Sequence, residues 1–226
     1  MNTSSTALLP YAALLRQFNA PPAGKLFCVH GDRSVFRVSL YAAAQVLAQG
    51  HPVALVDGAN RFDLYYVAEF ARRVASRREA VRKQLTPERL LDKIYISRAF
   101  TCYQMEATLT EHLPTFVRSH HIPVAMIFGL LDTFYDEQAP LFEAKAGLQR
   151  ILSSLHSMKR TEISILLAMQ DVRPASKERQ MLLPMVLSAM DDVYAVVQRD
   201  KRLQIVHEGK SSARQTVHCA TNASLR

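Results

Sequence analysis

The segment spanning residues 31–39 carries groups that could bind a phosphate. The phosphate-loop pattern GxxxxGK[ST] uses glycines so that backbone N–H groups surround a phosphate, a lysine to neutralise it and a hydroxyl to hold Mg²⁺. Gly31 takes the place of the first glycine and Arg37 that of the lysine, but Phe36 and Val38 replace the second glycine and the hydroxyl residue. The hydroxyls of this segment belong to Ser34 and Ser39. The pattern predicts a degenerate nucleotide site, or else an ordinary strand-to-helix loop.

These residues must be positioned by strands and helices that alternate along the chain. Strands are expected at Lys25–His30, Pro52–Val56, Ile94–Ile96, Val124–Phe128 and Ile163–Ala168. Helices are expected at Val38–Gln49, Phe62–Gln84, Cys102–His120 and Pro140–Met158, and a closing hairpin at Asp192–Gln198 and Leu203–His207. This order predicts an α/β fold with a mostly parallel central sheet, flanking helices and a C-terminal antiparallel hairpin. Ligands of such sheets bind beyond the carboxyl ends of the strands.

Length and composition favour one folded domain. The chain has 226 residues, of which 49% are hydrophobic and 21% charged, which disfavours a disordered or fibrous protein. A proline-rich linker at Asn19–Gly24 divides an N-terminal segment, 1–23, from a core domain at 24–210, and a flexible tail is expected at 211–226. The opening segment, Ala7–Phe18, is amphipathic and could pack on its own core or on a neighbouring subunit.

The sequence also restricts where the protein works. Its longest apolar runs are far shorter than the roughly 20 residues that cross a bilayer, and its N-terminus lacks the basic start of a secretory signal. Cys28, Cys102 and Cys219 form no metal-binding or disulfide pattern, and His120-His121 has no third ligand at suitable spacing. We therefore expect a cytoplasmic protein without a membrane segment and without a metal site.

Three stretches at strand ends, together with the order of elements, resemble the RecA-like recombinase ATPases. They are Val56–Asp63, Ser97–Gln104 and Ala168–Pro174, and Arg98-Ala99-Phe100-Thr101 is the most family-like part. The resemblance covers about residues 24–210 and implies a RecA-like P-loop NTPase fold. It also implies that Gln170 senses the γ-phosphate of ATP and leads into a mobile DNA-binding loop.

The departures from that family fall where hydrolysis would occur. A working site needs a lysine, a hydroxyl on Mg²⁺, a carboxylate at the end of the Walker B strand and a glutamate that orients water. Val38 cannot bind Mg²⁺, Phe128 or Gly129 takes the carboxylate position, and Ala59 takes that of the glutamate. The predicted degenerate site comprises Gly31, Ser34, Arg37, Ser39, Asp57, Asp132 and Gln170. We expect a pseudo-ATPase with no required cofactor, although Mg·ATP is the ligand if nucleotide still binds.

Positive charge marks a second kind of candidate site. The 28 lysines and arginines exceed the 20 acidic residues, giving a net charge of +8. Residues 72–93 hold eight of these cations against three carboxylates. Such a ridge suits a polyanion or an acidic partner, but it is equally typical of a solvated helix. The predicted DNA contacts are Arg72, Arg73, Arg77, Arg78, Arg173, Lys177, Arg179 and Lys210.

The sequence thus predicts a RecA-like accessory protein of DNA recombination or repair that binds DNA through its phosphates. Expected partners are DNA and other RecA-like or repair subunits, with a homo-oligomer as a further option. One alternative is an active, DNA-stimulated ATPase in which Arg37 and Asp132 substitute for the missing groups. The other is a RecA-fold scaffold that binds an acidic protein.

Overall fold

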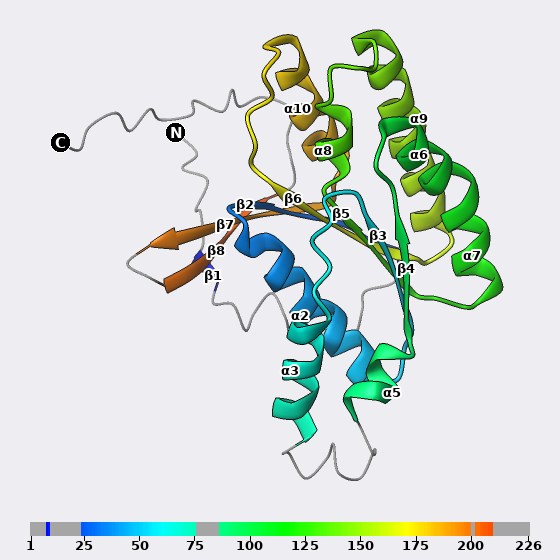
Figure 1. The fold of residues 1–226 in the computed structure, drawn as a ribbon, viewed down its shortest axis with the longest axis vertical. Coiled ribbons are helices and arrows are strands. Elements are labelled where there is room, and N and C mark those ends of the chain that lie inside the picture. The colour runs from blue at the N-terminus through cyan, green and yellow to red at the C-terminus, as the bar shows by residue number, and fades with distance from the viewer. Residues whose placement is uncertain (1–7, 10–23, 76–85, 200–201, 210–226) are drawn as a thin grey trace.

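A single sheet organises the part of the chain that the structure describes. The structure is a computed structural model, and it describes residues 8–9, 24–75, 86–199 and 202–209 (Figure 1). The strands are β1 (Leu8–Leu9), β2 (Leu26–Gly31), β3 (Val53–Asp57), β4 (Ile94–Arg98), β5 (Val124–Phe128), β6 (Ser164–Gln170), β7 (Asp192–Arg199) and β8 (Arg202–Gly209). They lie side by side in the order β1-β8-β7-β2-β6-β5-β3-β4.

The sheet is mostly parallel, as the continuous apolar runs predict. Strands β7, β2, β6, β5, β3 and β4 pair in parallel, whereas β8 pairs antiparallel with β7 and β1 pairs antiparallel with β8. Every residue of β3 and β5 is buried, because helices cover both faces of the sheet. The expected α/β fold with a C-terminal antiparallel hairpin is confirmed.

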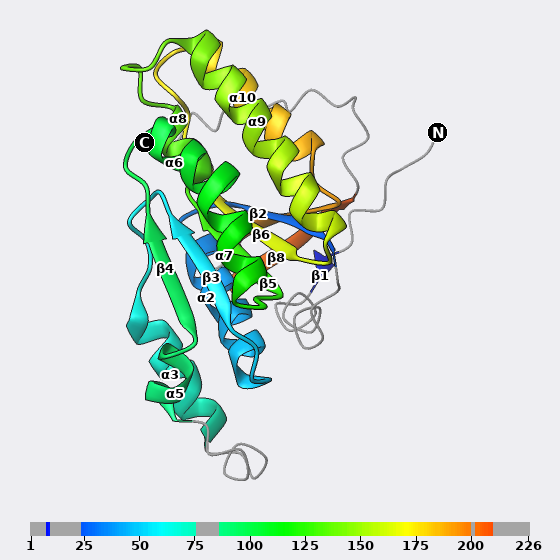
Figure 2. The ribbon, with the colours of Figure 1, turned by 90° about the vertical axis from the view of Figure 1, so that its right-hand side faces the viewer.

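Helices lie in two layers, one on each face of the sheet (Figures 1 and 2). One layer holds α2 (Ser34–Ala48), α3 (Leu64–Ala75) and α5 (Pro87–Leu91). The other holds α6 (Cys102–Ala107), the π-helical segment Thr108–His112, α7 (Leu113–Ser119), α8 (Leu130–Phe134), α9 (Leu141–Arg160), the 3₁₀ turn Glu178–Met181 and α10 (Leu182–Ser188).

Alternation along each strand divides the core into two halves. In β2, Phe27 and Val29 pack toward α2, whereas Leu26 and Cys28 pack toward the α6–α10 layer. Cys28 is fully buried, and its burial, with help from the charges of Asp171 and Glu208, raises the pKa of its thiol. It therefore packs as a small apolar residue, as expected from the sequence.

Three features of the helices differ from the sequence expectation. Helix α2 begins at Ser34, four residues before the predicted start, and the short helices α5, α8 and α10 were not predicted. The predicted helix at Cys102–His120 exists, but its middle turn is π-helical. Pro114 has no N–H to donate to the carbonyl of Thr110, so the chain there cannot complete the α-helical pattern.

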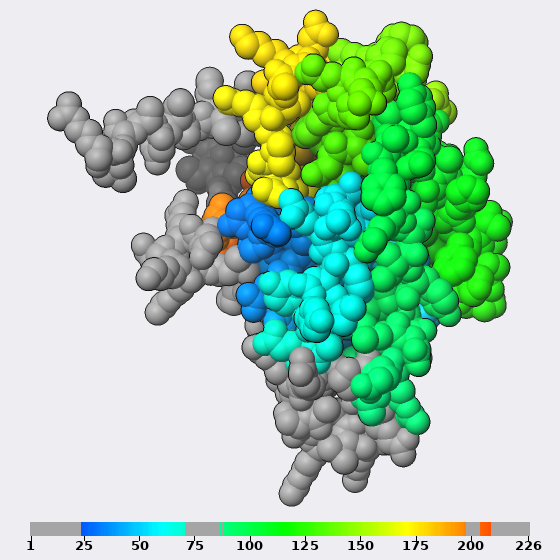
Figure 3. All heavy atoms as spheres, in the orientation of Figure 1, coloured from blue at the N-terminus to red at the C-terminus, as the bar shows by residue number. Residues whose placement is uncertain are grey.

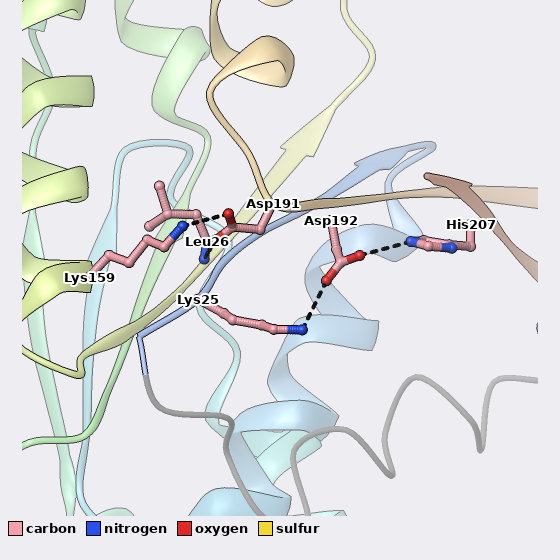
Figure 4. A network of polar contacts seen from close by, with 6 residues as sticks. All are labelled: Lys25, Leu26, Lys159, Asp191, Asp192 and His207. Carbon is pink, nitrogen blue, oxygen red and sulfur yellow. Dashed lines mark hydrogen bonds and ion pairs between the residues drawn. The ribbon is translucent and has the colours of Figure 1, made fainter. Parts of the chain in front are cut away.

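Ion pairs fasten the amino end of β2 to its neighbours (Figure 4). The carboxylate of Asp191 accepts hydrogen bonds from the Leu26 N–H at 2.9 Å and from Lys159 Nζ at 2.5 Å. Partial burial raises the pKa of Asp191, but these bonds outweigh it and hold the pKa below its usual value. Asp192 pairs with Lys25 at 3.4 Å and with His207 at 3.0 Å. Helix α9 and strands β2, β7 and β8 are thereby joined at this end.

The termini are only partly described. Leu8 and Leu9 of the predicted amphipathic segment form β1 against Val206 and Ile205 of β8, whereas the rest of residues 1–23, and the tail at 211–226, lie outside the described residues. Among the described helices, none has the length and apolar character to cross a membrane.

Gly31→Ala should destabilise the fold strongly. Gly31 has φ +141°, and a Cβ there would overlap the carbonyl oxygen of Val196 on β7. We expect a loss of about 3 kcal/mol in the free energy of unfolding, from backbone strain plus the clash. Gly50→Ala is the control, because Gly50 also has positive φ but its Cβ would meet only the end of Lys93. It should cost about 1 kcal/mol. Urea denaturation measures both, and equal losses would contradict the steric argument.

Candidate functional site

The predicted site residues converge on the carboxyl ends of the parallel strands. Figure 3 shows the segments that follow β2, β3 and β6, in blue, cyan and yellow, side by side on one face of the molecule. Gly31 and Gln170 are register partners at the ends of β2 and β6. Asp57 ends β3 opposite Phe128, which ends β5.

The connection from β2 to α2 is too short to surround a phosphate. Only Asp32 and Arg33 separate Gly31 from the first residue of the helix. The Asp32 carboxylate accepts hydrogen bonds from the backbone N–H of Ser34, at 2.7 Å, and from its hydroxyl. A helix N-terminus attracts anions through its free N–H groups and its dipole. Here the protein's own carboxylate occupies that position.

Phe36 closes the space behind this helix end. It is buried, and its ring lies 5.5 Å from that of Phe128 on β5. These two rings stand at the positions where the phosphate-loop pattern has a glycine and the Walker B strand has a carboxylate. Apolar packing between α2 and β5 therefore fills the space between these two positions.

The early start of α2 also determines where Arg37 and Ser39 lie. The exposed Arg37 guanidinium stacks 5.7 Å from the ring of Tyr41 and 5.1 Å from that of Tyr66 on α3, and its hydrogen bond with Tyr41 raises its pKa. Ser39 lies more than one turn inside the helix, fully buried, with no hydrogen-bond partner for its hydroxyl among the described residues. Neither side chain takes the role of the missing lysine or hydroxyl.

Asp57 holds the loop that follows β3. Its buried carboxylate accepts hydrogen bonds from the backbone N–H groups of Ala59 at 3.2 Å, Arg61 at 2.9 Å and Phe62 at 2.8 Å. Three backbone donors use most of the acceptor capacity of a carboxylate. Asp57 is thus engaged in shaping the loop.

The loop after β3 brings Arg61 close to the carboxylates of Asp57 and Asp132. Its guanidinium lies 5.9 Å from the ring of Phe36, and its Nε is buried without a hydrogen-bond partner in the described part of the chain. Partial burial raises the pKa of Asp132, and the charge of Arg61 opposes this rise. Asp57, Arg61 and Asp132 form a cluster that the sequence predicted only in part, because Arg61 carried no motif.

The predicted DNA-binding residues separate into three groups. Arg173 and Lys177, in the loop after β6, are exposed and have no ion pair with any described residue. Arg179 is buried and donates to the carbonyl oxygens of Phe134, at 2.5 Å, and Ala139. The structure describes the backbone but not the side chains of Arg72 and Arg73 in α3, and Arg77, Arg78 and Lys210 lie outside the described residues.

Arg33 joins Arg173 and Lys177 in a loop patch at adjacent strand ends. It is exposed at the start of α2 and has no ion pair with the described residues, and β2 and β6 are neighbours in the sheet. Arg33 was not predicted as a binding residue, because it stands outside any cluster of cations in the sequence. Its place directly after a strand was the available signal.

A charged triad was also missed. His30 Nδ1 lies 3.0 Å from Asp171 Oδ1, and its Nε2 lies 3.0 Å from Glu208 Oε2. Burial lowers the pKa of the imidazole, but the hydrogen bonds and charges of the two carboxylates outweigh burial and raise it to about 9. The protonated ring links β2 to the loop after β6 and to β8. Since Glu208 lies 178 residues from His30, no local pattern could predict this contact.

Within the ranges that the structure describes, no three side chains of the metal-binding types come together. Comparison with known proteins adds no assignment: no protein-family model matches the chain, and no curated protein is significantly similar to it in sequence.

Mg·ATP should bind the full chain with a dissociation constant above about 1 mM, because Asp32 and Phe36 occupy the two places that a phosphate group needs. Isothermal titration measures the affinity, and steady-state turnover with and without single-stranded DNA measures hydrolysis. Saturable, Mg²⁺-dependent binding below about 100 μM would contradict this expectation. Turnover abolished by Arg37→Ala would establish the active-ATPase alternative.

The triad should make stability depend on pH. Because folding raises the pKa of His30 to about 9, its contribution is complete below the unfolded pKa of about 6.5 and is lost as the pH rises through 9. His30→Gln should therefore lower the free energy of unfolding by about 1–2 kcal/mol more at pH 6 than at pH 10. Urea denaturation of both proteins tests this.

The exposed His51 provides the matched substitution. His51→Gln should produce the same small change at both pH values. An effect of His30→Gln that is equal at pH 6 and pH 10 would show that the ring acts only by packing.

Proposed function

We propose that this chain is a RecA-like domain that has lost ATP hydrolysis and binds DNA through its phosphates as an accessory factor in recombination or repair. The order of strands and helices and the stretches at the strand ends support the family assignment. So does the position of Gln170, at the end of β6 and beside Gly31, the first residue of the degenerate motif.

The observation that carries the DNA-binding part is the loop patch of Arg33, Arg173 and Lys177. Three exposed cations without ion pairs to described residues lie in the loops that follow two adjacent strands, with Lys177 seven residues beyond the end of β6. Such an arrangement neutralises the backbone phosphates of single-stranded or duplex DNA without contacts to the bases. Arg179 leaves the predicted set of contacts, because both carbonyls that it binds belong to the protein itself.

The same surface weighs against the ATPase alternative. Arg37 is stacked on two tyrosines and is directed away from the helix N-terminus, and the Asp32 carboxylate repels a phosphate there. The cations of the loop patch are free for a different anion. A polyanion that lies across the strand ends needs no enclosed pocket.

DNA binding should be salt-dependent and should require the loop patch. Fluorescence anisotropy with labelled single-stranded and duplex oligonucleotides measures it. If the patch neutralises three phosphates, affinity for a single strand should fall roughly 20-fold between 50 and 200 mM salt. Arg173→Ala with Lys177→Ala should lower the slope of log affinity against log salt by about 1.4.

A control variant removes equal charge elsewhere. Arg118 and Arg160 are exposed at the C-terminal ends of α7 and α9, and Arg118→Ala with Arg160→Ala should leave the slope unchanged. If both double variants lowered the slope equally, the effect would come from net charge and not from the loop patch. Binding that does not change with salt would exclude recognition of phosphates.

A further inference from the structure

His30 connects the two strand ends whose loops carry the loop patch. It is the last but one residue of β2, and Asp171 is the first residue of the loop after β6. Its Nδ1 lies 3.0 and 3.2 Å from the two carboxylate oxygens of Asp171. The backbone N–H of Asp171 also donates to the carbonyl of Gly31, at 2.7 Å. The loop that carries Arg173 and Lys177 is thus fastened to β2 at its first residue.

A second carboxylate binds the other side of the same ring. His30 Nε2 lies 3.0 Å from Glu208 Oε2 on β8. The His30 side chain is 12% exposed, whereas both carboxylate side chains are nearly half exposed. Its neighbours in the sheet, Met169 on β6 and Ala195 on β7, carry no charge. Among the described residues, Asp171 and Glu208 are therefore the charged groups that act on the imidazole.

The proton on His30 decides whether both carboxylates keep a hydrogen-bond donor. A protonated imidazole donates from both nitrogens, whereas a neutral ring has a single N–H. Loss of the proton therefore takes the hydrogen bond from either Asp171 or Glu208, and it leaves two negative charges with no positive charge between them. This change would occur at the first residue of the loop that holds two of the three cations of the loop patch.

Asp171 is close enough to the loop patch for its charge to act on a bound phosphate. It stands two residues before Arg173, so the Cα atoms of the two residues lie within about 8 Å of each other. Charges closer than the Debye length, about 8–10 Å at physiological salt, are only partly screened. A carboxylate at Asp171 without a cationic partner therefore repels a phosphate that binds Arg173, and the protonated His30 offsets this repulsion.

We propose that His30 is a positioning residue of the loop patch: it holds the loop after β6 against β2 and offsets the charge of Asp171, so that phosphates bind when its ring is protonated. The ring is largely buried between its partners, so it acts through Asp171 and not by contact with DNA. Burial lowers the pKa of the ring, but the two carboxylates outweigh burial and raise it to about 9. The effect is therefore complete at neutral pH and is lost as the pH rises through 9. This inference rests on the proposed function, because it concerns the regulation of the same surface.

Fluorescence anisotropy with a single-stranded oligodeoxyadenylate tests the charge effect, because adenine loses no proton between pH 7 and pH 9.5. The affinity of the wild-type chain should fall about 3- to 10-fold over this range. His30→Gln should be weaker by the same factor already at pH 7 and should not change with pH. His30→Lys keeps a positive charge at both pH values and should bind within about twofold of the wild type at pH 7. The variant His51→Gln, at an exposed position, should keep the wild-type pH profile.

Limited digestion with trypsin in the absence of DNA tests the hold on the loop. Trypsin cleaves after Lys177 when the loop opens, and mass spectrometry of the fragments follows this cut. At neutral pH, His30→Gln should speed cleavage after Lys177 about threefold or more relative to the wild type, because the loop has lost a fastening at its first residue. Cleavage after Arg160, at the end of α9, is the internal reference and should keep its wild-type rate.

The outcomes separate this inference from the proposed function. A wild-type chain that binds no oligonucleotide at either pH would overturn the proposed function, and with it the role of His30 in binding. DNA binding that requires Arg173 and Lys177 but changes neither with pH nor in His30→Gln would overturn this inference alone. Equal acceleration of the cuts after Lys177 and Arg160 would show that His30 only stabilises the fold, which would also overturn its role as a positioning residue.

Discussion

The carboxylate of Asp32 at the N-terminus of α2 determines the character of the whole candidate site. It accepts hydrogen bonds from Ser34, the first residue of the helix, which only Asp32 and Arg33 separate from β2. Helical geometry then assigns the following side chains to fixed faces. Phe36 enters the core against Phe128, Arg37 stacks between α2 and α3, and Ser39 is buried. A phosphate loop needs several residues outside the helix, and this connection has only Asp32 and Arg33.

Most carboxylates near the strand ends are already engaged within the protein. Asp57 accepts from the loop after β3, and Asp171 with Glu208 holds the protonated His30. The nearby cations Arg33, Arg173 and Lys177 have no such partners among the described residues. The cations in the loops after the strands are thus less neutralised by ion pairs than His30, because the carboxylates there bind groups of the protein itself. This distribution, more than the net charge of +8, is what the proposal of an extended anionic ligand rests on.

Sequence reasoning predicted the elements whose signals are local. Continuous apolar runs predicted the buried strands, Gly50 marked the end of α2, and the closing hairpin formed where expected. The predicted start of α2 was wrong by four residues, because the helix already begins at Ser34, and the buried Val35 and Phe36 belong to its core face. Helices α8 and α10 were missed since the first has only five residues and the second is apolar on all sides.

The sequence by itself determined the fold class and the absence of a complete phosphate-loop pattern, because these depend on apolar periodicity and on the identity of residues at fixed spacing. Only the tertiary structure decided what each polar side chain does. Arg179 binds two carbonyl groups that lie 45 and 40 residues before it in the sequence. His30 contacts the carboxylate of Glu208, which lies 178 residues after it. Such partners come together only when the strands pair, since a local sequence carries no information about the neighbour that the sheet supplies.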